Sequence, residues 1–429
     1  MRILQPLRKK LMFHAERSRA EVRLFTSLAF VLSLIVSVEP QTPSATPSSD
    51  GFSFEQLYEI AARDNLQVNA VRRRRAVAEA SVQIAGQRPN PDFISAYTRS
   101  EPRWQPSVSQ LIELGGKRGR RIDVARNELR LTELDLDAAL RTLRHDLRAA
   151  YFSLTLARNS YDLGQQALTQ AQDLANIARE RFEAGDIAQF EVLQANLGVD
   201  RATNDLDRLG NTERIARSTM NQLLNRAPDA PLDLRDSLFS RVGPVATQDL
   251  IARSLSQNVE LRTAEQQIAT EQSRLRLARA QRVPDLTLEP GLETYDSAHS
   301  NPGFKMQVTV PLPIFNRGRG EINRSSAILE QLQAERDAAR QRIAAEIARA
   351  SLNVESARHQ VEFYETKLLP DAERVRQLAN EAYRIGQTSL LSVIDATRNA
   401  REVRQAYLQA LFDYQTAVAD LEQAAGVKM

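Results

Sequence analysis

The sequence contains no cysteine, so the chain forms no disulfide and offers no cysteine ligand for zinc. Aromatic residues make up only 6% of the 429 residues, and the formal net charge of +3 is small for this length. A charge this close to zero gives no reason to predict a nucleic-acid partner. Ala, Arg, Gln, Leu and Glu dominate instead, which is a composition typical of long helices.

Long hydrophobic runs are equally scarce. Leu24–Val38 is uncharged and apolar, and basic residues precede it. The run is short for a spanning helix but has the length of the hydrophobic region of a secretory signal. We therefore predict a signal sequence over 1–38 and a Pro/Ser/Thr-rich linker over 39–51; a retained membrane anchor is the alternative. No later run reaches the ~18 apolar residues of a spanning helix.

Glycine and proline are absent from Glu321 to Leu369. Pro370 follows, but helix-forming residues continue to Gly386, which favours a kinked helix of roughly 65 residues, or ~100 Å at ~1.5 Å per residue. Within it, apolar and small residues recur at alternating steps of four and three. This heptad pattern places them on one face that packs lengthwise on other helices. The face consists of Ile343, Ile347, Ala350, Val354, Ala357, Val361, Tyr364 and Leu368.

The chain also repeats itself. Asn65 matches Asn258, and Pro91-Asp92 matches Pro284-Asp285, both at an offset of 193 residues. Later segments match at an offset of about 200, and Gly185 matches Gly386 at 201. Such internal repetition predicts two copies of one supersecondary unit. A first heptad face corresponds to the one above and comprises Leu140, Leu143, Leu147, Ala150, Leu154, Ala157 and Tyr161.

Each unit has the same predicted order: a helix, a β hairpin, a very long helix, a turn marked by glycine, and a long returning helix. The units span 52–225 and 246–426, and 226–245 links them. The first helices are expected at about 53–87 and 246–281. The hairpins are expected at Asp92–Arg99 with Pro106–Ile112, and at Asp285–Tyr295 with Phe304–Val310, the latter pair turning around His299–Gly303.

The last strand alternates apolar and polar residues throughout. Its apolar residues, Phe304, Met306, Val308 and Val310, are predicted to face lipid. An isolated hairpin is marginal in water, so the hairpins need partners. An apolar outer face suits a membrane barrel closed by several chains. The alternative is a small amphipathic sheet that caps a soluble coiled coil.

Two repeats of this kind resemble the TolC family of outer-membrane efflux channels, over about residues 52–426. The junctions Leu111–Gly119 and Pro311–Gly320 resemble its CzcC-like heavy-metal branch. Phe182–Asp186 and Tyr383–Ala396 resemble the periplasmic hairpin tips. Many relatives carry a cysteine after the signal; none stands here, so we expect no lipid-anchored N-terminus.

The resemblance implies a mainly α fold within a homotrimer, which forms a trimeric α-helical barrel across the periplasm and a 12-stranded transmembrane β-barrel in outer-membrane lipid. The tips at Gly185 and Gly386 would dock onto a periplasmic adaptor (membrane fusion protein) and an inner-membrane pump. Some channels of the family carry two acidic residues at the closed tip. Asp395 matches one of these positions, Ser392 stands at the other, and Glu191 aligns with Ser392 in the first repeat.

Asp395 and Glu191 are therefore candidates for the pore constriction. A ring of three Asp395 carboxylates would favour cations, whereas the alternative is an exposed acid at a helix start, which the helix dipole favours. The sequence contains no arrangement of residues that indicates a catalytic, cofactor or metal site, so we predict no enzyme.

The sequence thus predicts the outer-membrane channel of a tripartite, RND-type efflux system, a passive conduit most consistent with heavy-metal cations. Drug efflux and type I secretion are alternatives within the family. A soluble periplasmic coiled-coil scaffold or adaptor is the alternative from another class.

Overall fold

The computed structural model describes residues 51–238, 246–295 and 301–427. The predicted signal sequence and all of the predicted linker except Gly51 lie outside these residues. So does part of the predicted turn at His299–Gly303. The described residues belong to one compact unit, Asp50–Met429.

The two halves of this unit have the same order of elements. The first half contains α1 (Phe54–Asp64), α2 (Leu66–Ala85), β1 (Asp92–Tyr97), β2 (Trp104–Ile112), α3 (Lys117–Glu183) and α4 (Gln189–Leu223). The second contains α5 (Thr247–Gln257), α6 (Val259–Ala280), β3 (Leu286–Glu293), β4 (Gly303–Thr309), α7 (Arg319–Phe363), the π-helical segment η1 (Tyr364–Leu368), α8 (Leu369–Arg384) and α9 (Leu390–Ala425).

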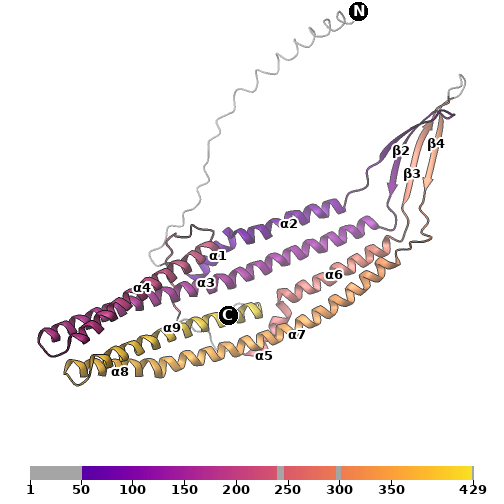
Figure 1. Cartoon of the computed structure of the whole chain (residues 1–429). Helices are drawn as coiled ribbons and strands as arrows, with labels where there is room; N and C mark the ends of the chain where they lie inside the picture. The colour runs from indigo at the N-terminus through magenta and orange to yellow at the C-terminus, as the bar shows by residue number, and fades with distance from the viewer. Residues whose placement is uncertain (1–50, 239–245, 296–300, 428–429) are drawn as a thin grey trace, which may run out of the picture. The chain divides into compact units, whose positions relative to one another are not determined.

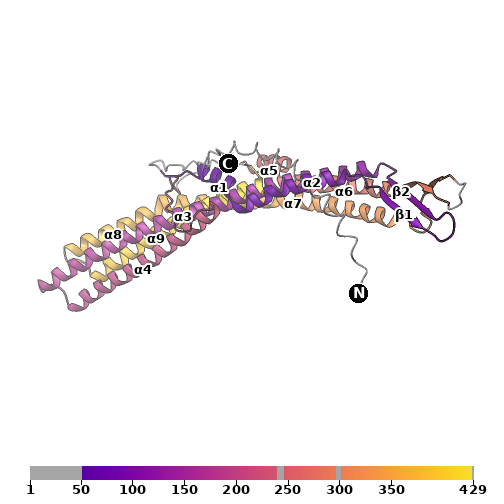
Figure 2. The same ribbon diagram turned by 90° about the horizontal axis from the view of Figure 1, so that it is seen from above.

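The strands lie at one end of this unit, and the α3–α4 and α8–α9 turns lie together at the other (Figures 1 and 2). The helix α3 alone is 67 residues long, which corresponds to ~100 Å. The predicted helix of similar length in the second half is present as α7, η1 and α8 in direct succession.

The two hairpins form a single antiparallel sheet in the order β1-β2-β3-β4. The pairing of β2 with β3, in which Leu111 lies opposite Thr287, joins the two repeats. Because β1 and β4 are the outer strands, the sheet ends in two edges within the described part of the chain. Each edge presents backbone N–H and C=O groups that still need partners.

The predicted heptad faces form the core. Leu147, Leu154, Ile343 and Ile347 are each at most 1% exposed. They belong to one cluster that also contains residues of α1, α4, α5, α6 and α9. The patterned faces of the two long helices are therefore buried in one core, as their spacing predicts. Helix α3 packs mainly on α2, α4, α6 and α9, and α7 packs on α5, α6 and α9.

The single helices predicted at 53–87 and 246–281 are wrong, because each is broken at an asparagine. Asn65 and Asn258 adopt extended backbone angles and cap the following helices, accepting hydrogen bonds from the backbone N–H groups of Gln67 and Glu260. Each side-chain amide also donates to a carbonyl near the end of its repeat's last helix, that of Leu223 at 3.0 Å or Ala424 at 3.2 Å. One buried asparagine thus closes each repeat.

Pro370 does not end its helix. It occupies the first turn of α8, directly after the π-helical segment η1. A π turn takes up one more residue than an α turn. The offset between the repeats rises by one residue over this stretch, from 200 at the heptad faces to 201 at Gly185 and Gly386. The π turn accounts for the extra residue and places it next to the proline, which has no N–H to donate.

The described part of the linker, 226–238, packs onto the repeats. Leu232 and Leu238 are buried in the core. The Tyr151 hydroxyl accepts from the Asp236 N–H at 2.8 Å and donates to the Phe52 carbonyl at 3.2 Å. Burial raises the pKa of Tyr151 to about 12. This hydroxyl therefore stays protonated and ties the linker to the start of the first repeat.

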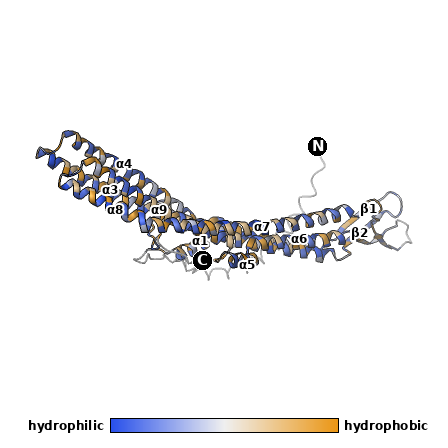
Figure 3. Ribbon diagram, turned by 90° about the horizontal axis from the view of Figure 1, so that it is seen from below, coloured by the Kyte–Doolittle hydropathy of each residue, from blue (hydrophilic) through white to orange (hydrophobic). Residues whose placement is uncertain are grey.

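Hydrophobic and hydrophilic residues are mixed along every long helix (Figure 3). Within the described residues, no helix combines the length and apolar character needed to cross a membrane.

Replacing Asn65 or Asn258 by alanine should remove a helix cap and leave a helix-end carbonyl without its donor. We expect each change to lower stability by about 1–2 kcal/mol, and the double change to give roughly the sum. Thermal unfolding in detergent would measure the effect. Asn211→Ala, at an exposed position of α4, is the control and should change stability by less than ~0.5 kcal/mol; an equally small effect at Asn65 would contradict the capping role.

Candidate functional site

The candidate residues fall at the two ends of the unit. Gly185, Gly386, Glu191 and Asp395 lie in or near the α3–α4 and α8–α9 turns, whereas Phe304, Met306 and Val308 lie in β4. Val310, which the alternation also placed in this strand, follows the last residue of β4, Thr309. A third group, at the junction between sheet and helices, became visible only in the structure.

Both glycine turns have the same geometry. Gly185 and Gly386 have φ values of +83° and +78°. At each turn the glycine N–H donates to the carbonyl three residues back, and the next residue's N–H donates to the carbonyl five back. This is a Schellman motif, which ends a helix by means of one left-handed residue. A Cβ at either glycine would meet no atom within 4 Å, so the backbone conformation alone requires glycine there.

The two turns pack together through a small second core. It contains residues of α3, α4, α8 and α9, with Tyr383, Leu390 and Val393 at most 3% exposed. The Arg181 guanidinium lies 4.8 Å from the Tyr383 ring centroid and donates to the Tyr383 carbonyl at 3.4 Å. The hairpin tips of the two repeats thus form one end surface.

Asp395 and Glu191 both lie early in returning helices but are not brought together by any contact within the described residues. Asp395 is about half exposed and lies 3.2 Å from Arg398 on its own helix. Its neighbour Ala396 is buried, so Asp395 lies off the packed face of α9. Glu191 is partly buried in the first turn of α4.

A groove of about 640 Å³ runs between the four helices near the tips. Its lining mixes charges, with Arg201, Arg398 and Arg401 beside Asp205, and the Arg401 guanidinium is 3.8 Å from the Asp205 carboxylate. The hydroxyl of Tyr383, which also lines the groove, has no hydrogen-bond partner among the described residues. These charged and polar groups share the groove with apolar side chains such as Leu174, Ile177 and Val393.

One face of the sheet is mainly apolar and the other is mainly polar. The observed register places apolar and aromatic residues of all four strands on one face. Ser107, Glu289, Lys305 and Gln307 lie on the other, where the Ser107 hydroxyl donates to Glu289 at 2.8 Å. The apolar face consists mainly of Phe93, Tyr97, Trp104, Val108, Leu288, Pro290, Leu292, Phe304, Met306 and Val308.

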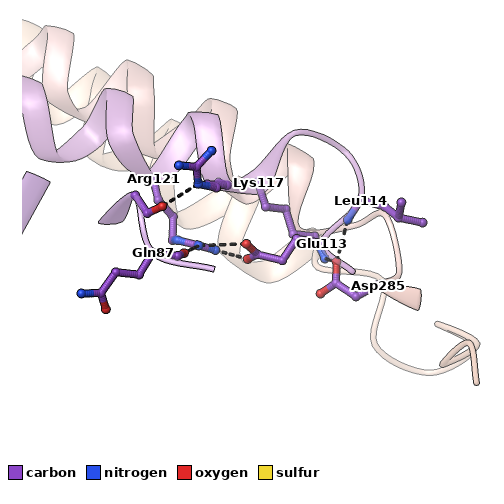
Figure 4. A network of polar contacts seen from close by, with 8 residues as sticks. Gln87, Glu113, Leu114, Lys117, Arg121 and Asp285 are labelled. Atoms are coloured by element: carbon purple, nitrogen blue, oxygen red, sulfur yellow. Dashed lines mark hydrogen bonds and ion pairs between the residues drawn. The ribbon is translucent and has the colours of Figure 1, made fainter. Parts of the chain in front are cut away.

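The junction of sheet and helix contains an ion pair between the repeats (Figure 4). Lys117, the first residue of α3, donates to Asp285, directly before β3, at 2.7 Å. The Leu114 N–H donates to the same carboxylate at 3.0 Å. The side chains of Lys117 and Asp285 are only 10% and 25% exposed. Burial alone would raise the pKa of Asp285, but the two hydrogen bonds and the nearby charges of Lys117 and Arg121 together outweigh it, so the pKa is lowered.

A second pair lies beside the first. Arg121 donates to Glu113 from both terminal nitrogens of its guanidinium, Nη1 and Nη2, the second at 3.0 Å (Figure 4). The hydrogen bond from Arg121 lowers the pKa of Glu113 despite the burial of its carboxylate. Both acids at this junction are therefore charged at neutral pH, and both bind cations of α3.

Sequence reasoning missed the role of these junction residues. The segment Leu111–Gly119 was singled out only for its resemblance, and Pro284-Asp285 only as part of the repeat. The available signal was the repetition itself: an acid follows proline at the start of β1 and β3, and a cation is the first residue of α3 and α7.

Comparison with known proteins places this geometry in a family. The model of the family described as "Outer membrane efflux protein" matches residues 57–226 and 250–427, so the chain belongs to this family. The cobalt-zinc-cadmium resistance protein CzcC of Cupriavidus metallidurans is 24% identical over 380 residues, covering 87% of this chain and 90% of the relative. The pyoverdine export outer membrane protein OpmQ of Pseudomonas aeruginosa is 24% identical over 327 residues, covering 75% and 69%.

Solved structures share the fold. The CmeC outer membrane channel of Campylobacter jejuni superimposes with a TM-score of 0.72 at 16% identity, covering 87% of this chain and 85% of that one. The resemblance to outer-membrane efflux channels is thereby confirmed, and the protein is an outer-membrane protein with a periplasmic helical domain. The roles predicted for Asp395, Glu191 and the glycine tips stay predictions.

Replacing Gly386 by valine should strain the turn, because a β-branched residue must adopt φ near +78°. We expect a loss of about 1–2 kcal/mol and impaired efflux, with the oligomer still in the membrane. Gly386→Asn should cost less, since asparagine tolerates this region.

Gly198→Ala is the matched control, since its Cβ would also meet no atom within 4 Å and its φ is not left-handed. This change inside α4 should stabilise the helix by up to ~1 kcal/mol. Melting temperatures and efflux assays of the three variants would measure these effects. Unaltered efflux in Gly386→Val would argue against a role for the tip.

Proposed function

We propose that the protein is the outer-membrane channel of a tripartite efflux system, a passive homotrimeric conduit for heavy-metal cations. The observation that carries the proposal is the sheet that both repeats build together, with one face apolar across all four strands.

Closure of this sheet into a membrane barrel would satisfy two physical requirements of the isolated chain. Its edges at β1 and β4 need backbone partners, and its apolar face needs a nonaqueous environment. Three copies placed edge to edge would give 12 strands, with the apolar residues in lipid and the polar face around an aqueous lumen. The aromatic residues Phe93, Tyr97, Trp104 and Phe304 on the outer face fit the interface belts of membrane barrels.

The opposite end suits docking. Both hairpin tips end in the same direction and share one small core, so three copies would present six matched turns to a periplasmic adaptor and an inner-membrane pump. The long helices in between would form the wall of a tunnel. The energy for transport would come from the pump, and the channel would need no catalytic group.

The identity of the cargo rests on the relatives. CzcC is named for resistance to cobalt, zinc and cadmium, and it covers the larger share of this chain. OpmQ is named for pyoverdine export and has the same identity over a shorter stretch. Metal cations are therefore our first proposal and export of an organic compound the second. Cation preference of the purified channel distinguishes them.

A lipid-facing β4 predicts opposite outcomes at neighbouring positions. Val308→Arg should cost ~2–4 kcal/mol if residue 308 lies near the bilayer midplane. Gln307→Arg should be mild, because residue 307 lies on the polar face opposite Glu289. Heat resistance of the detergent-extracted oligomer would measure both. Equal tolerance at both sites, or release of the protein from membranes by high salt alone, would favour the soluble scaffold.

Three Asp395 carboxylates around the narrow end of a trimer should favour cations. Asp395→Asn removes three charges and almost no volume, so the cation preference should fall, although Arg398 beside each carboxylate moderates the effect. Glu191→Gln should do less, since Glu191 is partly buried. Reversal potentials in a salt gradient across planar bilayers would measure both changes. Unaltered selectivity in Asp395→Asn would leave Asp395 as an exposed acid at a helix start.

A further inference from the structure

The two junctions between sheet and long helix correspond residue by residue. Gly116 and Gly318 cap α3 and α7 in the left-handed conformation, with φ of 70° and 67°, and a cation follows each. Asp92 and Asp285 each follow a proline at the start of β1 and β3. Lys117 therefore corresponds to Arg319, and Asp285 corresponds to Asp92.

The strand register supports this correspondence independently. Ile94 pairs with Ser107, and Thr287, which corresponds to Ile94 at the offset of 193, pairs with Thr309. Ser107 of β2 therefore corresponds to Thr309 of β4, which is 202 residues later in the sequence. The same spacing separates Gly116 from Gly318. Strands and helix caps give the same alignment of the junctions.

Only one of the two corresponding ion pairs exists within the chain. Lys117 and Asp285 are bound to each other and largely buried. Arg319 and Asp92 are exposed, and neither side chain has an ion-pair or hydrogen-bond partner within the ranges that the structure describes. The contact that is present joins the first repeat to the second, so its counterpart would have to join the second repeat to the first repeat of another copy.

Two apolar side chains at the second junction are also more exposed than the residues at the corresponding positions of the first. Ile314 and Phe315 are 60% and 100% exposed. Their counterparts at the first junction, Ile112 and Glu113, are partly buried, beside β3 of the following repeat. If β1 of a second copy paired with β4 as β3 pairs with β2, that copy would cover Ile314 and Phe315.

We propose that Arg319 binds Asp92 of the partner subunit and that this ion pair closes the ring at the level of the junction. Head-to-tail contacts that repeat one rotation generate a closed ring. Here the second repeat of one copy would be placed against the first repeat of the next copy as the first repeat is placed against the second within one chain. The inference rests on the proposed oligomeric channel and adds the residues that hold its subunits together.

Cross-linking tests the pair cleanly because the chain contains no cysteine. The variant Asp92→Cys with Arg319→Cys, treated with a short bismaleimide in membranes, should give covalent dimers and trimers in SDS. Each single variant should stay monomeric. The matched control, Lys117→Cys with Asp285→Cys, should be linked within the chain and give no ladder.

Charge exchange provides a second measurement. Asp92→Arg or Arg319→Asp alone should lower the fraction of trimer that survives mild SDS severalfold, and the two changes together should restore it. Native mass and detergent extraction of the same samples report on the channel itself. A trimer in the membrane without a covalent ladder or charge rescue overturns the ion pair alone, whereas a monomer released by salt overturns the proposed function as well.

Discussion

The pairing of β2 with β3 is the contact on which the rest of the architecture depends. An isolated hairpin is marginal in water, and each repeat contributes two strands among the residues that the structure describes. By joining their hairpins edge to edge, the repeats build a sheet wide enough to carry a continuous apolar face. The same pairing helps to set the direction of both long helices, because α3 and α7 are the next elements along the chain after β2 and β4.

The contacts at the junction connect the sheet rigidly to the start of α3. Asp285 binds both the Leu114 N–H and the Lys117 ammonium, so the end of one repeat's hairpin is attached to the start of the next repeat's strand. A partly buried ion pair contributes less to stability than to geometry, since desolvation offsets much of its attraction. Its value here is that it sets the angle at which a helix of 67 residues leaves the sheet.

Much of this fold could be predicted because its signals are periodic. The heptad spacing of Ile343 to Val361 and the alternation of Phe304 to Val310 each report a single buried or apolar face. Asn65 and Asn258 were visible as repeated residues, but their capping role depends on carbonyls of Leu223 and Ala424, which lie 158 and 166 residues away. The Lys117–Asp285 pair was missed for the same reason: pattern reasoning finds faces of elements and not contacts between distant ones.

The repeats differ most where the second long helix contains η1. Helix α3 is continuous, whereas Pro370 removes one backbone donor and a π turn precedes it. Glu365 in this segment accepts a hydrogen bond from the Tyr407 hydroxyl of α9 at 2.7 Å, which joins the interrupted helix to its returning partner. Because proline removes a helical hydrogen bond, we expect bending of the α8–α9 hairpin to cost less here than in the continuous helix α3. A sequence built from two nearly equal repeats thus gives two mechanically unequal hairpins at one end surface.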